Sequence, residues 1–277
     1  MKRRDYILLL LLSWVILLGG CSGCNINKKK SSNNVFRPLS TAEKRLIDSI
    51  NNKNLKTTLE KYITSHPSDI GRPPSLGGWL WIQALSEGNE DKIIAIMKLL
   101  LAYGSDINED DGAFTPLNAA LKNKQEQVAK FMLNQPNIDI NKTVSQWPLA
   151  PIHTAVIYNS ADIVQTLLSK GACVNTRTTD EFRPLIKKES TALHILVSCP
   201  FRYTIKGINL NSPEESEKIL NLLLDHPDVD VNAKDDEDKT PLYLCKEALL
   251  NSRTLEEAST KRFLEHVQNV LKAKSRV

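Results

Sequence analysis

A short phrase returns along this chain at a nearly fixed interval and limits the folds that the chain can adopt. Each copy is an apolar run followed by a short polar segment that ends in asparagine, and Asn108, Asn141 and Asn175 lie 33 and 34 residues apart. A fourth copy ends at Asn232. A repeat of this length is typical of arrays of stacked supersecondary units. The chain is therefore predicted to bury one continuous core between neighbouring units.

A second phrase follows each asparagine and has the composition of a helix start. A threonine hydroxyl suits the N-cap because it accepts a hydrogen bond from a free backbone N–H of the first turn. Proline suits the next position because the N–H that it lacks would have no partner there. The copies begin at Thr115, Ala150, Thr191 and Thr240, and all but the third continue with proline.

The apolar runs end at residues suited to stopping a helix. Gly104 and Gly171 occupy this place, where the backbone needs a positive φ. The following Asp-Ile-Asn and Asp-Val-Asn segments alternate polar and apolar residues, as an extended arm does. Each copy therefore predicts a helix, a turn, a second helix and a protruding hairpin.

The period and the opening phrase resemble the ankyrin repeat, whose T-P-L-H-x-A phrase is matched in part by residues 115–120, 150–155 and 191–196. The resemblance covers residues 41–274 and implies an all-α ankyrin-repeat solenoid of helix pairs with short β-hairpin tips. It also implies that His153 and His194 tie neighbouring repeats together through backbone hydrogen bonds and are not catalytic. About six repeats are expected, the terminal ones degenerate and the last with a polar outer face, at 41–72, 73–111, 112–146, 147–188, 189–236 and 237–274.

Two segments lengthen the regular pattern. The hairpin of the fourth repeat carries extra residues at 177–189, and a second insertion at 199–213 separates the helices of the fifth repeat. Insertions in repeat arrays fall in loops, often on a binding face. Neutral growth of a loop is the alternative.

Residues 1–20 have the pattern of a secretory signal peptide. Three basic residues precede the apolar run Tyr6–Leu18, which is shorter than the roughly 20 residues of a membrane-spanning helix. The end of this segment, Leu-Gly-Gly-Cys, resembles the lipobox of bacterial lipoproteins, which implies a diacylglycerol on the thiol of Cys21. An uncleaved anchor and an ordinary secretory signal are the alternatives.

The residues from Cys21 onward predict a flexible linker and the membrane to which the protein is sorted. Residues 21–40 are rich in Asn, Lys and Ser, which is typical of a flexible linker. Ser22, where the enteric sorting rule would place aspartate for inner-membrane retention, favours the outer membrane or cell surface. The protein is therefore predicted to be a membrane-anchored lipoprotein of the bacterial envelope.

Several classes of site are not indicated. The formal charge of +4 gives no argument for nucleic-acid binding. Residues 228–239 begin like a calcium-binding loop, but Ala233 stands where glycine is needed and Lys239 where a bidentate glutamate is needed. No catalytic residue, metal or cofactor is predicted. Cys173 and Cys245 fall in apolar patterns and are expected to be buried thiols, with a disulfide among the cysteines as the alternative.

The resemblance implies an unidentified protein partner, bound by the hairpin tips and first helices of a monomer. Residues 235–238 are interpreted as a solvated acidic tip. Of Trp79 and Trp81, at most one can face the core, and an exposed tryptophan would suit partner binding. The predicted contact residues are Glu109, Asp110, Asp111, Lys142, Thr143, Val144, Thr176, Arg177, Thr178, Lys234, Asp235 and Asp236.

Three functions follow as hypotheses. The first is a membrane-anchored protein–protein interaction module, which is not an enzyme. The second is an immunity or inhibitor protein that binds and blocks an envelope enzyme or toxin. The third is an enzyme whose site lies in the insertion at 199–213.

Overall fold

The computed structural model describes residues 38–64, 76–158, 160–182, 186–198, 213–250 and 258–275. All of them belong to one compact unit, which runs from Phe36 to Val277. The signal segment, Cys21 and most of the tether lie outside the described residues, as do Cys199 and nearly all of the insertion at 199–213. No helix in the described part is long and apolar enough to cross a membrane.

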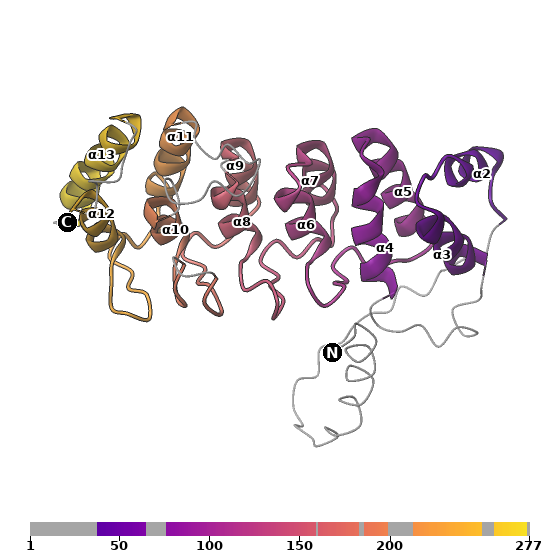
Figure 1. Ribbon diagram of the computed structural model, residues 1–277, viewed down its shortest axis with the longest axis horizontal. Helices are drawn as coiled ribbons and strands as arrows, with labels where there is room; N and C mark the ends of the chain where they lie inside the picture. The colour runs from indigo at the N-terminus through magenta and orange to yellow at the C-terminus, as the bar shows by residue number, and fades with distance from the viewer. Residues whose placement is uncertain are drawn as a thin grey trace, which may run out of the picture. The chain divides into compact units, whose positions relative to one another are not determined.

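The described residues form six successive helix pairs (Figure 1). From the second pair onward, first helices pack on first helices and second helices on second helices, as α6 does on α8 and α7 on α9. The first pair differs, because α2 packs on α5 and α3 packs on α4. The all-α solenoid is thus confirmed. The pairs are α2 (Thr41–Asp48) with α3 (Lys53–Thr64), α4 (Leu76–Ala84) and the 3-10 turn η1 (Leu85–Glu87) with α5 (Glu90–Ala102), α6 (Pro116–Lys122) with α7 (Glu126–Leu133), α8 (Pro151–Ile157) with α9 (Ala161–Ser169), α10 (Ala192–Ser198) with α11 (Pro213–Leu224), and α12 (Pro241–Leu250) with α13 (Ala258–Lys274).

The predicted helix cap is confirmed at two of the three threonines, whereas the Thr191 hydroxyl lies 2.9 Å from His194 Nδ1 and does not cap a backbone N–H. The Thr115 hydroxyl accepts a hydrogen bond from the Asn118 N–H at 3.1 Å, and the Thr240 hydroxyl accepts one from the Tyr243 N–H at 3.2 Å. Gly104 and Gly171, at the ends of α5 and α9, have φ of 78° and 87°. This left-handed conformation lets the chain leave the second helix and enter the loop.

The hairpin tips differ from the expectation, because no strand forms in the described loops. Two isolated bridges, Val144–Trp147 and Phe182–Ile186, are their only β pairings among the described residues. Short turns replace the strands, since in three of the four arms an aspartate carboxylate accepts the N–H two residues ahead. These bonds run to Asp106 from Asn108, to Asp139 from Asn141 and to Asp230 from Asn232. In the fourth arm Cys173 stands at that place.

Two buried positions agree with the sequence interpretation. Trp81 is fully buried and donates its indole N–H to the Ser105 hydroxyl at 2.9 Å, whereas Trp79 is half-buried. Cys245 is a buried thiol.

Two other predictions are wrong. Cys173 is exposed. Its neighbours Ala172 and Val174 are buried in the core, so the side chain between them faces solvent. The outer face of the last pair is not wholly polar, since Tyr243 and Leu250 of α12 are 51% and 83% exposed. No further helix of the described chain covers α12 on its outer side.

Candidate partner-binding face on the loop edge

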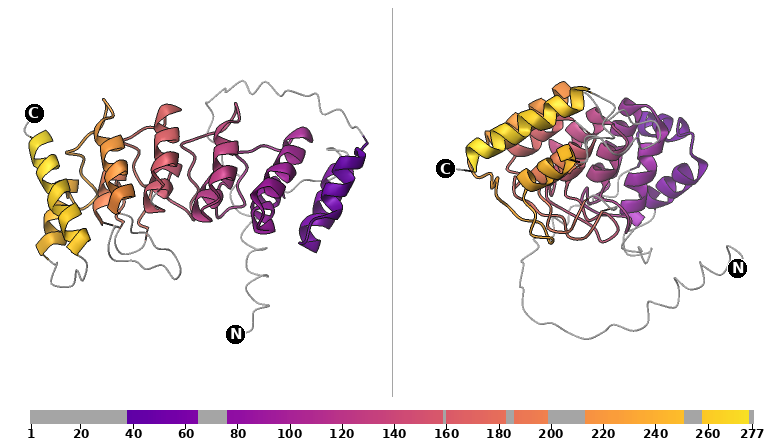
Figure 2. Two further views of the ribbon diagram at one scale, coloured as in Figure 1. Left: turned by 90° about the horizontal axis from the view of Figure 1, so that it is seen from above. Right: turned by 60° about the vertical axis from the view of Figure 1, so that its left-hand side comes forward.

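Four loops that precede the first helices α6, α8, α10 and α12 project from the same side of the helix pairs (Figures 1 and 2). We call their described residues the loop edge: 103–115, 134–150, 170–182, 186–191 and 225–240. All twelve predicted contact residues lie on it. The short turns within the pairs lie at the other end of the helices.

The repeated asparagines fasten each loop to the next. The Asn108 carboxamide accepts a hydrogen bond from the Asp139 N–H at 2.7 Å and donates one to the Asn137 carbonyl at 2.7 Å. The Asn175 carboxamide makes the same pair of bonds with the Asp230 N–H and the Asp228 carbonyl, at 2.8 and 2.6 Å. Asn141 makes only the first bond, from the Cys173 N–H, at 3.4 Å. The 33-residue period therefore fixes the loops in register.

The fourth residue of the opening phrase makes a second set of links. The Nε2 atoms of His153 and His194 lie 2.8 and 3.0 Å from the carbonyl oxygens of Thr176 and Lys239, in the loops that lead to the next first helices. In the third repeat Asn118 takes this place and donates to the Leu149 carbonyl at 3.0 Å. The expected structural role of both histidines is confirmed.

Both imidazoles are neutral in this arrangement. Burial lowers the pKa of His153 to about 4, although its bond to the Thr176 carbonyl favours the charged form. Its Nδ1 accepts the Ala150 N–H, so Nε2 carries the proton that it donates to Thr176. Burial also lowers the pKa of His194, whose Nδ1 accepts the Thr191 N–H. All four ring nitrogens of the two histidines are thus engaged in hydrogen bonds to the backbone.

Thr178 closes the insertion at 177–189 and does not face solvent. Its side chain is 1% exposed, which corrects the expectation that it lies on a contact surface. Its backbone N–H donates to the Ser190 carbonyl, its hydroxyl donates to the Lys187 carbonyl, and the Ser190 N–H donates back to that hydroxyl. Burial of this residue is the consequence of bringing the two ends of the inserted loop together.

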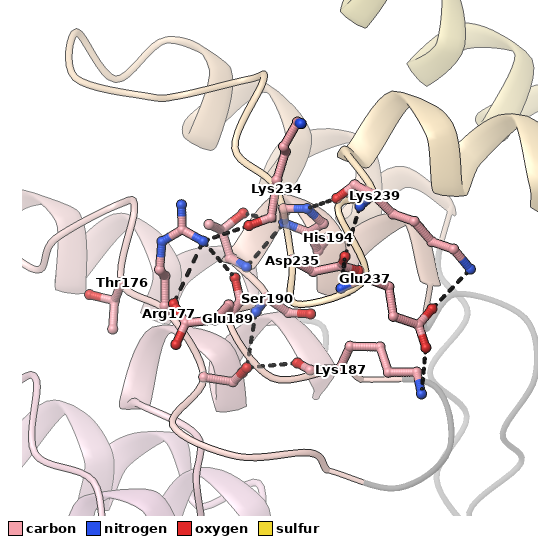
Figure 3. A network of polar contacts seen from close by, with 12 residues as sticks. Thr176, Arg177, Lys187, Glu189, Ser190, His194, Lys234, Asp235, Glu237 and Lys239 are labelled. Atoms are coloured by element: carbon pink, nitrogen blue, oxygen red, sulfur yellow. Dashed lines mark hydrogen bonds and ion pairs between the residues drawn. The ribbon is translucent and has the colours of Figure 1, made fainter.

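Asp235 is also buried, at 6% exposure, and corrects the interpretation of residues 235–238 as a fully solvated tip. One carboxylate oxygen accepts the N–H groups of Glu237 and Lys239, at 3.0 and 2.9 Å (Figure 3). A carboxylate that caps its own turn must point inward, so the exposed acidic residues of this tip are Asp236, Glu237 and Asp238.

The insertion packs against the loop that follows it. The Arg177 guanidinium donates to the Lys234 carbonyl at 2.6 Å and to the Glu189 carbonyl at 3.1 Å (Figure 3). Glu237 pairs with Lys187 at 2.9 Å and with Lys239 at 3.0 Å. The inserted residues described here are therefore an ordered part of the loop edge.

Ten of the predicted residues remain accessible. Arg177, Lys234 and Asp236 are exposed, and the other seven are half-buried. Among these, the Lys142 ammonium lies 2.8 Å from the Asp110 carboxylate and joins the first two loops. Burial alone would raise the pKa of Asp110, but Lys142 outweighs it and lowers that pKa.

A row of aromatic side chains on the loop edge escaped the sequence interpretation. The rings of Phe114, Trp147 and Phe182 come from three successive loops, and each neighbouring pair of ring centroids is 4.7 Å apart. Trp147 is 6% exposed, whereas the two phenylalanines are half-buried. The Lys122 ammonium of α6 lies 4.2 Å from the Phe114 centroid and 5.7 Å from that of Trp147. The 33-residue spacing of Phe114 and Trp147 is the signal that could have identified this row.

The loop edge is acidic although the whole chain is basic. It holds fifteen acidic and seven basic side chains, whereas the chain has 32 acidic and 36 basic residues. Within the described residues no group of three or more His, Cys, Asp or Glu side chains is arranged to hold a metal ion. The loop edge offers charged groups, hydrogen-bonding groups and ring faces to a partner.

Comparison with known proteins agrees with the fold. Residues 92–178 match the family model of ankyrin repeats in three copies. Over 212 residues the chain is 27% identical to alpha-latrocrustotoxin-Lt1a of Latrodectus tredecimguttatus. The matched region covers 76% of this chain and 14% of that protein. Over 92 residues it is 27% identical to alpha-latroinsectotoxin-Lt1a of the same organism, covering 33% of this chain and 6% of that protein. The chain thus contains ankyrin repeats and spans a small part of the length of these relatives.

Proposed function

We propose that this protein is a protein-binding module whose loop edge is the contact face, held at a bacterial membrane by lipid on Cys21. Ankyrin repeats suggest a protein–protein interaction module. The observation that carries the choice of face is the set of asparagine bonds that fixes successive loops to one another. A surface ordered before binding loses less conformational entropy when the partner arrives.

The inserted loop favours a selective partner. Residues 177–182 and 186–189 appear in one repeat only and are joined to the following loop by Arg177 and Lys187. They give the array a local shape that its other repeats do not share. A protein that blocks one envelope enzyme or toxin would use such a feature, and loss of the partner's activity on binding would separate this role from that of a scaffold.

Photo-crosslinking in the native cells tests the contact face. A photoreactive residue at Arg177 or Asp236 is expected to capture the same specific envelope protein. The same residue at Asp91 or Asp162, exposed at the other end of the helix pairs, is the control. Equal capture from both ends, or capture from neither, would contradict the proposal.

The anchor has its own experiment. Labelled palmitate is expected to enter the wild-type protein and not the Cys21→Ala variant, and the variant should leave the membrane fraction. Equal labelling of the two proteins would exclude lipidation at Cys21 without bearing on the contact face.

A further inference from the structure

We propose that the aromatic row of Phe114, Trp147 and Phe182 is the docking site for a basic segment of the partner protein. The inference rests on the proposed function and specifies the chemistry of the partner. Lysine or arginine side chains of this segment would lie against the ring faces, between the acidic side chains of the surrounding loops.

The rings offer a surface that a cation can use. An aromatic face attracts an ammonium or guanidinium group within about 6 Å of its centroid. The row demonstrates this with the chain's own Lys122, whose ammonium is 4.2 Å from the Phe114 centroid. Phe114 and Phe182, at the two ends of the row, are half-buried, so both keep part of their ring surface within reach of a partner.

The charge around the rings selects the same kind of partner. The loops that carry them also carry Asp106, Asp139 and Asp180, whose side chains are exposed. Acidic side chains outnumber basic ones fifteen to seven on the whole loop edge. Such a field attracts a basic segment and opposes anionic lipid or nucleic acid.

Lys122 has a distinct role in this arrangement. Its ammonium occupies ring surface that a partner's cation would use, and it adds a like charge at the docking site. The Lys122→Met variant keeps an apolar stem of similar length but frees the rings. It is therefore expected to bind a basic segment more tightly, a direction that general loss of structure would not produce.

Binding of a fluorescent nona-arginine peptide to the purified full chain, followed by anisotropy at low salt, tests the proposal. The triple variant Asp106→Asn, Asp139→Asn, Asp180→Asn retains the side-chain oxygens that accept backbone N–H groups at these turns. It is expected to bind about threefold to tenfold more weakly. Lys122→Met is expected to bind about twofold to fivefold more tightly.

A matched control separates position from total charge. The variant Asp91→Asn, Asp162→Asn, Glu265→Gln removes the same three charges from exposed sites on α5, α9 and α13, away from the loop edge. It is expected to bind like wild type. Equal weakening in both triple variants, or unchanged binding in Lys122→Met and in both triple variants, would overturn the proposal.

The ring faces have a separate test. Phe182→Leu keeps an apolar side chain, and its circular dichroism should match wild type while peptide binding falls. Unchanged binding would remove the rings from the proposal. If the crosslinks at Arg177 and Asp236 succeed but nona-arginine does not bind, the proposed function stands and the basic partner is excluded.

Discussion

The His153 imidazole lies 2.8 Å from the Thr176 carbonyl oxygen and links the fourth helix pair to the loop in front of the fifth. The insertion at 177–189 begins directly after Thr176. In the next repeat the same bond reaches Lys239, just before the helix cap at Thr240. The inserted residues thus come after the histidine contact in the chain. The bond from the fourth helix pair to this loop is therefore kept although the loop is longer.

Burial of this imidazole makes stability depend on pH. The folded pKa of His153 is about 4, below its ordinary value of 6.5. Between these values the unfolded chain binds more protons than the folded chain, so stability falls as pH falls. Urea denaturation should show a loss of about 2 kcal/mol in unfolding free energy between pH 7.5 and pH 5 from His153 alone. His194, whose pKa is also lowered, adds to this loss in the same direction.

The control for this prediction is His153→Asn, since Asn118 makes the equivalent bond in the repeat before. The variant keeps a donor but cannot titrate, so its loss of stability over the same pH range should be smaller than that of wild type. An unchanged pH dependence would show that His153 is not the responsible group.

Two adjacent glycines in α4 give a paired test of packing. A Cβ on Gly78 would lie 2.1 Å from the Asp110 carbonyl oxygen, whereas one on Gly77 would meet the flexible end of the Glu109 side chain. Gly78→Ala should therefore destabilise the protein by about 1–3 kcal/mol, because a backbone must shift. Gly77→Ala should cost less, since the carboxylate can move aside and alanine favours the helix. Thermal unfolding of the two variants checks this order.

The periodic features of the fold could be predicted from the sequence, and the features created by three-dimensional closure could not. Thr115 predicts a helix start and Gly171 predicts a helix end, because each acts on the backbone of its own turn. The burial of Thr178 depends on its meeting Ser190 across the insertion, and the burial of Asp235 depends on a turn folding back on its carboxylate. The row from Phe114 to Phe182 is an intermediate case, because the 33-residue spacing of Phe114 and Trp147 could have indicated it but Phe182 lies in the insertion, outside the regular period.

The two described thiols should differ sharply in reactivity. Cys173 is exposed, whereas Cys245 is buried, donates to the Leu264 carbonyl and has its pKa raised to about 11 by burial. Since the thiolate is the reactive form, iodoacetamide at pH 8 should modify Cys173 in the folded protein and Cys245 only after unfolding. Peptide mass spectrometry at successive times distinguishes the two sites. Equal rates at Cys173 and Cys245 in the folded protein would contradict this assignment.

The asparagine bonds predict which of two alanine variants, at Asn175 or at Asn141, destabilises the protein more. Asn175 makes two short bonds to the next loop, whereas Asn141 makes one at 3.4 Å. Replacing Asn175 with alanine leaves two backbone groups of that loop without a protein partner and should cost about 1–3 kcal/mol of unfolding free energy. Asn141→Ala should cost less, because a single long bond is lost. If the two variants unfold at the same urea concentration, these hydrogen bonds do not account for the contribution of the repeated asparagine to stability. If Asn175→Ala alone also weakens crosslinking at Asp236, the bonds hold the loop edge in its binding shape.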